Sequence, residues 1–108
     1  MDPEPFIHIN KVIHEKGRLG IVSMLAASPN LSFSEIKEAL RMTDGNLTAH
    51  MKTLQQAGYV AVTKAINKKR SLTTYSLTPD GQKEFETYLA HLDNIVRQTK
   101  IIKSREIV

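Results

Sequence analysis

The sequence of 108 residues contains no cysteine and no tryptophan. The absence of cysteine excludes disulfide bonds and thiolate metal sites. No apolar run approaches the roughly 20 residues that a membrane-spanning helix needs, and the N-terminus, MDPEPFIHIN, does not resemble a signal peptide. The hydrophobic fraction of 41% and the charged fraction of 24% are ordinary for a globular protein. We therefore expect one soluble, cytoplasmic domain that does not contact a membrane.

Acidic residues are also missing from one contiguous third of the chain. Between Gly45 and Pro79 there is no Asp or Glu, whereas the rest of the sequence has ten bases against eleven acids. The formal net charge of +4 therefore arises in this window. A polyanion-binding surface requires such localised positive charge, although acid-free windows also occur by chance. The basic residues of the window are Lys52, Lys64, Lys68, Lys69 and Arg70.

The first third of the chain is predicted to be helical from its caps and apolar spacing. Asn10 is placed to cap a short helix through Val12 and Ile13. A longer helix is predicted from Arg18 to Ser28. Its apolar face consists of Leu19, Val22, Leu25 and Ala26.

Two further helices follow with little sequence between them. Ser32 and Glu35 have the spacing of a capping box, which predicts a short helix that ends near Leu40. Thr43 is a good N-cap for the next helix, and Gly58 is placed as the left-handed residue that ends it. Two short helices joined by so brief a link are typical of a helix-turn-helix.

A hairpin and a long helix complete the predicted elements. Residues 59–63 and 73–77 alternate and are rich in β-branched side chains, which predicts two strands. The sequence between them, KAINKKRSL, predicts a long basic tip. Thr78 and Pro79 then suit the N-cap and first position of a helix, whose apolar spacing continues to about Thr99.

A resemblance to a known family lies in the stretch LSFSEIKEALRMTDGNLTAHMKTLQQAGYVAVTKAINKKRSLTTYSLTPDGQKEF. It is similar to the winged helix-turn-helix of MarR/ArsR-like transcriptional regulators, and most similar to their small single-domain group. The similarity covers about residues 18–96, and its most specific blocks are TDGNLTAH and AGYV. It implies a DNA-binding fold that is usually homodimeric and that carries no catalysis.

The expected fold class is mainly α with a small β-hairpin (α+β), arranged as a winged helix-turn-helix. Residues 1–108 form a single winged-helix DNA-binding domain, with a core over about residues 18–78. N-terminal and C-terminal helices flank this core and mediate dimerisation. The C-terminal dimerisation helix is expected over about residues 79–100.

The helix over residues 43–57 is the expected recognition helix, because its outward face is small, polar and sparsely charged. A helix that enters the major groove needs such a face. Asn46 can pair bidentately with adenine, whereas Lys52 and Thr53 suit phosphates. The candidate DNA-binding residues of this helix are Gly45, Asn46, Thr48, Ala49, His50, Lys52 and Thr53.

Alternatives remain open on this helix. Asp44 either stabilises the helix dipole or accepts a hydrogen bond from a cytosine amine. His50 either contacts phosphate or packs partly against the core. The whole face is alternatively a solvated surface, although such surfaces usually carry more charge.

The basic hairpin tip is the expected wing. Basic side chains on a hairpin suit the DNA backbone or the minor groove, where narrow A·T tracts favour arginine. The alternative is a charged edge that resists aggregation. The candidate DNA-binding residues of the wing are Lys68, Lys69, Arg70 and Ser71.

Apolar residues near both chain ends exceed what one small core needs. On the last helix, Phe85, Leu89 and Val96 are expected to continue the core, and other apolar residues to face a second copy. The alternative is that all of them are core. Paired subunits would place two recognition helices about 34 Å apart, one turn of DNA. The candidate dimer interface consists of Phe6, Ile9, Ile13, Tyr88, Leu92, Ile95, Thr99 and Ile102.

An enzyme is not expected, because no nucleophile–base–orienter set and no phosphate-cradling glycine loop is recognisable. The four histidines have no metal-ligand spacing, so we expect no metal and no cofactor. The sequence indicates a homodimeric, sequence-specific transcriptional regulator of double-stranded DNA, with an unknown effector. The alternative is a winged-helix protein–protein adaptor that binds no DNA.

Overall fold

The structure is a computed structural model that describes residues 1–67 and 70–100 of the chain. It confirms a mainly helical fold with a small antiparallel sheet. In chain order the elements are α1 (Glu4–Ile7), α2 (Lys16–Ala27), β1 (Leu31–Ser32), α3 (Phe33–Leu40), α4 (Asp44–Gln56), β2 (Val60–Asn67), β3 (Arg70–Leu77) and α5 (Pro79–Thr99).

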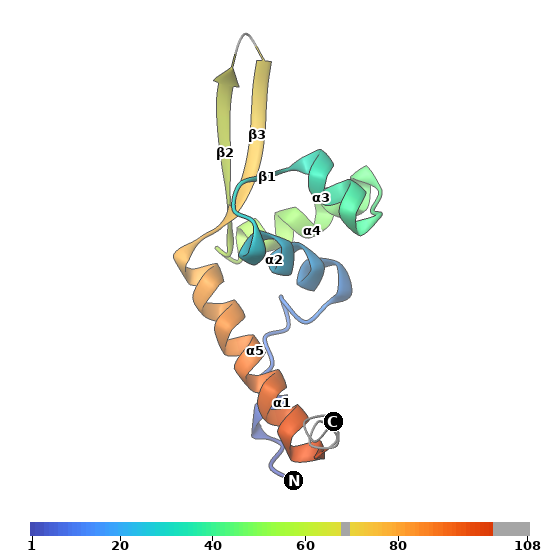
Figure 1. The fold of residues 1–108 in the computed structure, drawn as a ribbon, viewed down its shortest axis with the longest axis vertical. Helices are drawn as coiled ribbons and strands as arrows, with labels where there is room; N and C mark the ends of the chain where they lie inside the picture. The colour runs from blue at the N-terminus through green and yellow to red at the C-terminus, as the bar shows by residue number, and fades with distance from the viewer. Residues whose placement is uncertain (68–69, 101–108) are drawn as a thin grey trace, which may run out of the picture.

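The subunit is elongated, with a longest dimension of 56 Å. Figure 1 shows the β2–β3 hairpin and α5 pointing to opposite ends, with α2, α3 and α4 between them on one side. The short helix α1 lies beside the far end of α5. No helix in the described part of the chain is long and apolar enough to cross a membrane.

The hairpin is longer than the sequence predicts. β2 and β3 pair along their whole length, and the last pair before the turn joins Asn67 to Arg70. The predicted hairpin is confirmed, but its strands were predicted too short: residues 64–67 and 70–72, expected in the basic tip, belong to β2 and β3. The backbone ladder continues through residues that are exposed on both faces, where alternation of apolar and polar side chains gives no signal.

The third strand, β1, was not predicted. It pairs with the other edge of β3, placing Leu31 opposite Tyr75 and Ser32 opposite Thr74. Two residues are too few to show alternation, so this strand exists only because β3 offers its hydrogen bonds. The strand order is β1-β3-β2.

The predicted caps of α3 and α4 are confirmed. The Ser32 hydroxyl accepts from the backbone N–H of Glu35 at 3.1 Å, and the Glu35 carboxylate accepts from the N–H of Ser32 at 3.0 Å. The Thr43 hydroxyl accepts from the N–H of Asn46 at 3.1 Å. Between these helices Arg41 has a left-handed backbone, with φ of 54°. That conformation, unusual for arginine, makes the tight turn of the helix-turn-helix.

The start of α5 is bound to the end of α4. The Thr78 hydroxyl accepts from the N–H of Gly81 at 2.9 Å and donates to the carbonyl of Gly58 at 2.5 Å. The N–H of Thr78 also donates to the carbonyl of Tyr59 at 3.0 Å. Gly58 has φ of 82°, as expected for the residue that ends a helix.

The N-terminal segment differs from its prediction. The Asn10 side chain does accept from the N–H groups of Val12 and Ile13, at 2.9 and 3.1 Å, but these residues form a turn and not a helix. α2 begins at Lys16, because Glu15 and not a later residue is its N-cap. Helix α1 was not predicted.

The core lies where α2, α3, α4 and α5 meet the base of the sheet. Ala26, predicted to be in the core, is exposed, and Ile21 is buried instead. Two predicted dimer-interface residues also belong to the core: Ile13 and Tyr88 are 0% and 1% exposed. Their assignment to a partner surface was wrong, because the N-terminal segment folds over α5 within one subunit. The buried apolar residues are Ile13, Ile21, Val22, Leu25, Ile36, Leu47, Met51, Leu54, Val60, Phe85 and Tyr88.

Candidate nucleic-acid interface

Helix α4 has one buried and one exposed face. Its buried stripe consists of Leu47, Met51 and Leu54, which hold the helix against the core. The opposite face is open to solvent, so this part of the sequence prediction for the helix agrees with the structure. The exposed candidates are Gly45, Asn46, Thr48, Ala49 and Lys52, and the partly exposed ones are His50 and Thr53.

Asp44, the acidic residue of α4, is paired within the subunit. The Asp44 carboxylate lies 2.7 Å from the ammonium of Lys37 on α3. Asp44 is also the first residue of α4, where a negative charge is favoured by the helix dipole. These two local roles account for its presence and leave the outward face without uncompensated negative charge.

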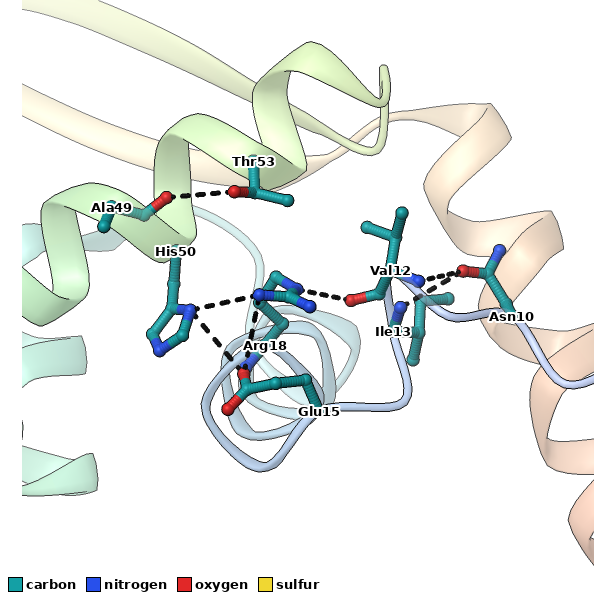
Figure 2. A network of polar contacts seen from close by, with 8 residues as sticks. All are labelled: Asn10, Val12, Ile13, Glu15, Arg18, Ala49, His50 and Thr53. Atoms are coloured by element: carbon teal, nitrogen blue, oxygen red, sulfur yellow. Dashed lines mark hydrogen bonds and ion pairs between the residues drawn. The ribbon is translucent and has the colours of Figure 1, made fainter.

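His50 turns toward the start of α2. Its Nδ1 atom lies 3.4 Å from Nη1 of Arg18 and 3.6 Å from the carboxylate of Glu15, two contacts drawn as dashed lines in Figure 2. A β-carbon on Gly17 would lie only 2.7 Å from Nε2 of His50, so glycine lets the ring approach the α2 backbone. The histidine side chain is 25% exposed. This position agrees better with partial packing than with a free phosphate contact.

Arg18 and Glu15 form the rest of this polar network, and sequence analysis did not identify them. The Nε of Arg18 donates to the carbonyl of Val12 at 2.6 Å, while its backbone N–H donates to Glu15 at 2.8 Å. That backbone donation is the main reason that the pKa of the Glu15 carboxyl is lowered, against the opposing effect of burial. Glutamate is not among the preferred N-cap residues and arginine is not the third residue of a capping box, so the sequence carries no standard signal for this cap.

Thr53 makes a bond within its own helix. Its hydroxyl donates to the carbonyl of Ala49 at 3.2 Å (Figure 2). The hydroxyl oxygen can still accept, but its proton is not available for a phosphate oxygen in this rotamer. Thr53 is therefore a weaker candidate than the exposed Lys52.

The β2–β3 hairpin, which we call the wing, extends beyond α3 and α4 (Figure 1). Arg70 and Ser71 are exposed at the start of β3, and Lys64 is exposed on β2. Lys68 and Lys69, predicted at the tip, lie outside the described residues. The described part of the wing thus presents basic side chains at its outer half.

An open pocket of about 300 Å³ adjoins the N-terminal end of α4. It separates the start of α2 from the turn between α3 and α4, and we call it the turn pocket. Two of its basic residues, Lys16 and Arg41, lie outside the acid-free window, which is why the charge pattern did not reveal them. The pocket is lined by Glu15, Lys16, Gly17, Leu40, Arg41, Met42, Asn46 and His50.

A second candidate surface is formed by α1 and α5, which we call the stem. The prediction that Leu89 and Val96 are core was wrong, because they are 45% and 39% exposed. The α5 stripe that faces inward contains Phe85, Tyr88 and Leu92. Of the other predicted interface residues, Phe6 and Thr99 are exposed, Ile9, Leu92 and Ile95 are partly exposed, and Ile102 lies outside the described residues.

Within residues 1–67 and 70–100, no three His, Cys, Asp or Glu side chains are grouped so that they could hold a metal ion. His8 contacts Glu4, His14 contacts Tyr88 and His50 contacts Glu15. These histidines are therefore distributed among separate local contacts.

Comparison with known proteins identifies relatives of the same fold. Residues 18–96 match the profile of the winged helix DNA-binding domain family. An uncharacterised protein of Methanocaldococcus jannaschii is 33% identical over 79 residues, which cover 73% of this chain and 86% of that protein.

Solved structures agree with this family. A transcriptional regulator homologue from Pyrococcus horikoshii superposes with a TM-score of 0.84 and 29% identity, covering 91% of this chain and 99% of that one. A protein from Enterococcus faecalis assigned to the MarR family of transcriptional regulators has a TM-score of 0.71 and 23% identity, covering 93% of each chain.

The family and fold are those of regulators and not of enzymes. The range of the match, residues 18–96, also confirms the resemblance identified from the TDGNLTAH and AGYV blocks. The chain therefore belongs to the winged helix DNA-binding domain family, and its fold is that of MarR-family transcriptional regulators.

Proposed function

We propose that this regulator binds double-stranded DNA sequence-specifically as a homodimer, with α4 in the major groove and the wing on the backbone or minor groove. The observation that carries the proposal is the outward face of α4, which is exposed, small and free of unpaired acid. The major groove is about 12 Å wide and accepts a helix whose outer side chains are short.

We assign direct base recognition to exposed residues in the first half of α4. Asn46 has the amide geometry that pairs with the N6 and N7 atoms of adenine. Thr48 can bond a base edge, and the Ala49 methyl suits the methyl of thymine. Gly45 leaves open space at its β-carbon position, which allows the helix end to approach the DNA closely.

We assign phosphate contacts to the basic residues around these positions. Lys52 is exposed one turn beyond Thr48, and Arg70 is exposed on the wing. Such contacts orient the protein on the duplex without specifying sequence. The sequence also places Lys68, Lys69 and Ser71 in the wing, where they would contribute to its contact with the DNA backbone.

The stem supports the homodimer. Two hydrogen bonds tie the N-terminus to α5: Gln98 accepts from the N–H of Asp2 at 2.7 Å and donates to its carbonyl at 3.0 Å. Beside them, Phe6 and Ile7 are 64% and 59% exposed. An apolar pocket of about 260 Å³ lies between these residues, Ile9, Lys11 and His14. A second stem would cover this apolar surface, together with Leu89, Ile95 and Val96.

Selection of bound sequences from random duplex DNA, with measurement of mass in solution, tests the proposal. We expect a palindromic consensus and a doubled mass. Asn46→Ala should relax preference at one base pair of each half-site, by about 1–3 kcal/mol. Arg70→Ala should instead weaken binding to all sequences and reduce the salt slope by about 0.9.

A matched control for the charge is available at the end of α5. Lys100→Ala removes one positive charge from the residue that follows this helix, at the end of the subunit remote from the wing, and should leave affinity and specificity unchanged. Wild-type protein that selects no consensus and binds duplex without salt dependence would contradict the proposal. That result would favour the protein–protein adaptor.

A further inference from the structure

The turn pocket lies at the end of the recognition helix that is farther from the wing. In Figure 1 the start of α2 and the turn between α3 and α4 lie on the side of the subunit away from the β2–β3 hairpin. Asn46 lines the pocket and also stands on the outward face of α4. The pocket is therefore continuous with the proposed DNA-binding face.

The pocket has an excess of positive charge. Lys16 and Arg41 are both exposed, and neither forms an ion pair with any residue of the described ranges 1–67 and 70–100. Glu15 is the one carboxylate in the lining, and it is engaged by Arg18 at 3.8 Å and by His50 at 3.6 Å. Two cationic side chains are thus left without a counterion.

The position of Arg41 is fixed by the turn that it makes. Its left-handed backbone follows the last residue of α3, and the next N–H, of Met42, donates to the carbonyl of Lys37 at 3.1 Å. Lys16 is held by the first turn of α2, which Glu15 caps. Both side chains therefore leave ordered backbone on opposite walls of the same opening.

We propose that the turn pocket, through Lys16 and Arg41, binds a DNA backbone phosphate at the end of α4 remote from the wing. The inference rests on the proposed function, because it assumes that α4 lies in the major groove. A helix in that groove has phosphates on both rims. The wing reaches only one of them, and the turn pocket supplies the contact at the other.

A phosphate of the duplex fits this site better than a small free anion. Binding sites for small anions usually use free N–H groups at the start of a helix. Here the N–H group of Arg18 already donates to the Glu15 carboxylate at 2.8 Å. Flexible cationic side chains at an open pocket remain, and these are typical of contacts to the DNA backbone.

The salt dependence of DNA binding tests the inference. Lys16→Ala and Arg41→Asn should each lower the magnitude of the salt slope, by up to the value of about 0.9 for one lost phosphate contact, without changing the selected sequence. Asparagine is chosen because it tolerates the left-handed backbone at this position. Arg41→Lys keeps the charge and should keep the slope, and Lys100→Ala, directly after α5, should behave as wild type.

Neutral methylphosphonates placed singly along the bound duplex locate the contact. The positions at which this change weakens wild-type binding identify the contacted phosphates. At one of these positions, the methylphosphonate should no longer weaken binding by Arg41→Asn. For Arg70→Ala, the position that loses its effect should be a different one, on the other side of the recognised bases. Loss of the same position in both variants would overturn the inference.

Two further results would also overturn it. One is an unchanged salt slope in Lys16→Ala and Arg41→Asn while Arg70→Ala lowers it, which would leave the proposed function intact. The other concerns inorganic phosphate added at constant ionic strength. If it displaces DNA from wild type but not from Arg41→Asn, the pocket is a small-anion site. If wild-type protein shows no salt-dependent binding to duplex, the proposed function itself fails.

Discussion

The carbonyl oxygen of Tyr59 occupies the space that a β-carbon on Gly81 would need. The same carbonyl accepts from the N–H of Thr78 at 3.0 Å, so the first turn of α5 rests directly on the backbone that leaves α4. Only glycine allows two backbone segments to approach so closely. The junction between α4 and α5 therefore requires a residue without a side chain at position 81.

Gly81→Ala is expected to destabilise the protein by about 1–3 kcal/mol, because the methyl group would meet backbone that cannot rotate away. Gly45→Ala is the matched control: its β-carbon would meet nothing within 4 Å. Within a helix that change should stabilise by about 0.5–1 kcal/mol. Urea denaturation measures both, and equal effects of the two variants would contradict the role of the Tyr59 contact.

Asp44→Asn is expected to strengthen DNA binding. The change removes a negative charge from the start of α4 and releases Lys37, which now lies 2.7 Å from it. Stability should change by no more than about 1 kcal/mol, because the pair is exposed. Titration of several unrelated duplexes measures the effect. Loss of affinity confined to sites with one particular base pair would instead show that Asp44 reads a cytosine.

Glu15→Gln is expected to lower stability at neutral pH but progressively less in acid. Hydrogen bonding, chiefly from the N–H of Arg18, lowers the pKa of the Glu15 carboxyl in the folded protein below its ordinary value of 4.5. The carboxylate therefore stabilises the fold above pH 4.5, and this stabilisation is lost as the pH falls toward the folded pKa. The difference in unfolding free energy between wild type and variant should shrink below that pH.

Urea denaturation at a series of pH values measures this difference. A difference that stays constant through the acid range would show that the effect of Glu15 comes from packing. Arg18 and His50 also form ion pairs with Glu15, and these add to the effect of the helix cap. Repeating the series in high salt separates the two contributions, because salt screens the ion pairs more than it weakens the cap.

Tyr88→Phe is expected to cost about 0.5–1.5 kcal/mol at neutral pH, because the buried hydroxyl lies 2.8 Å from Nδ1 of His14. Burial also raises the pKa of the Tyr88 phenol above its ordinary value of 10.0. Ionisation in the unfolded chain therefore destabilises wild type above pH 10.0, and the variant escapes this loss. The unfolding free energies of wild type and variant should therefore converge above pH 10.0. A constant difference between them would contradict the raised pKa of the buried Tyr88 phenol.

Leu89→Glu is expected to give monomers, because Leu89 is 45% exposed on the proposed stem surface. A charge in an apolar interface is strongly unfavourable unless it is paired. Thr87→Glu places the same charge on an exposed position on another side of α5 and should remain dimeric. Sedimentation or light scattering measures the mass, and a dimer that survives Leu89→Glu would exclude this surface from the interface.

Local signals explain most of what could be predicted. The caps at Ser32, Thr43 and Thr78 depend on residues only three positions apart, and all three are present in the fold. The apolar stripe of α4 likewise follows from spacing alone. Because these elements depend little on the rest of the chain, the helix-turn-helix and its outward face could be expected from sequence.

Contacts between distant segments explain what could not be predicted. β1 forms only against β3, and Ile13 and Tyr88 become buried only when the N-terminal segment crosses α5. The same holds for the network at His50, which joins α4 to residues 32 positions away or more. Lys16 and Arg41 meet at one pocket for this reason, although no sequence pattern connects them.

The length of the β2–β3 ladder has a consequence for the extent of the operator. Eight extended residues in each strand reach roughly 26 Å at about 3.3 Å per residue, close to three quarters of a helical turn of B-form DNA. From Thr63 onward the described side chains of β2 are exposed, and β1 pairs only with the inner half of β3. In the proposed complex, a subunit of 12.2 kDa would thereby contact the backbone well outside the segment beneath its helices. Duplexes shortened in their flanking base pairs should then lose affinity even when the half-site is intact.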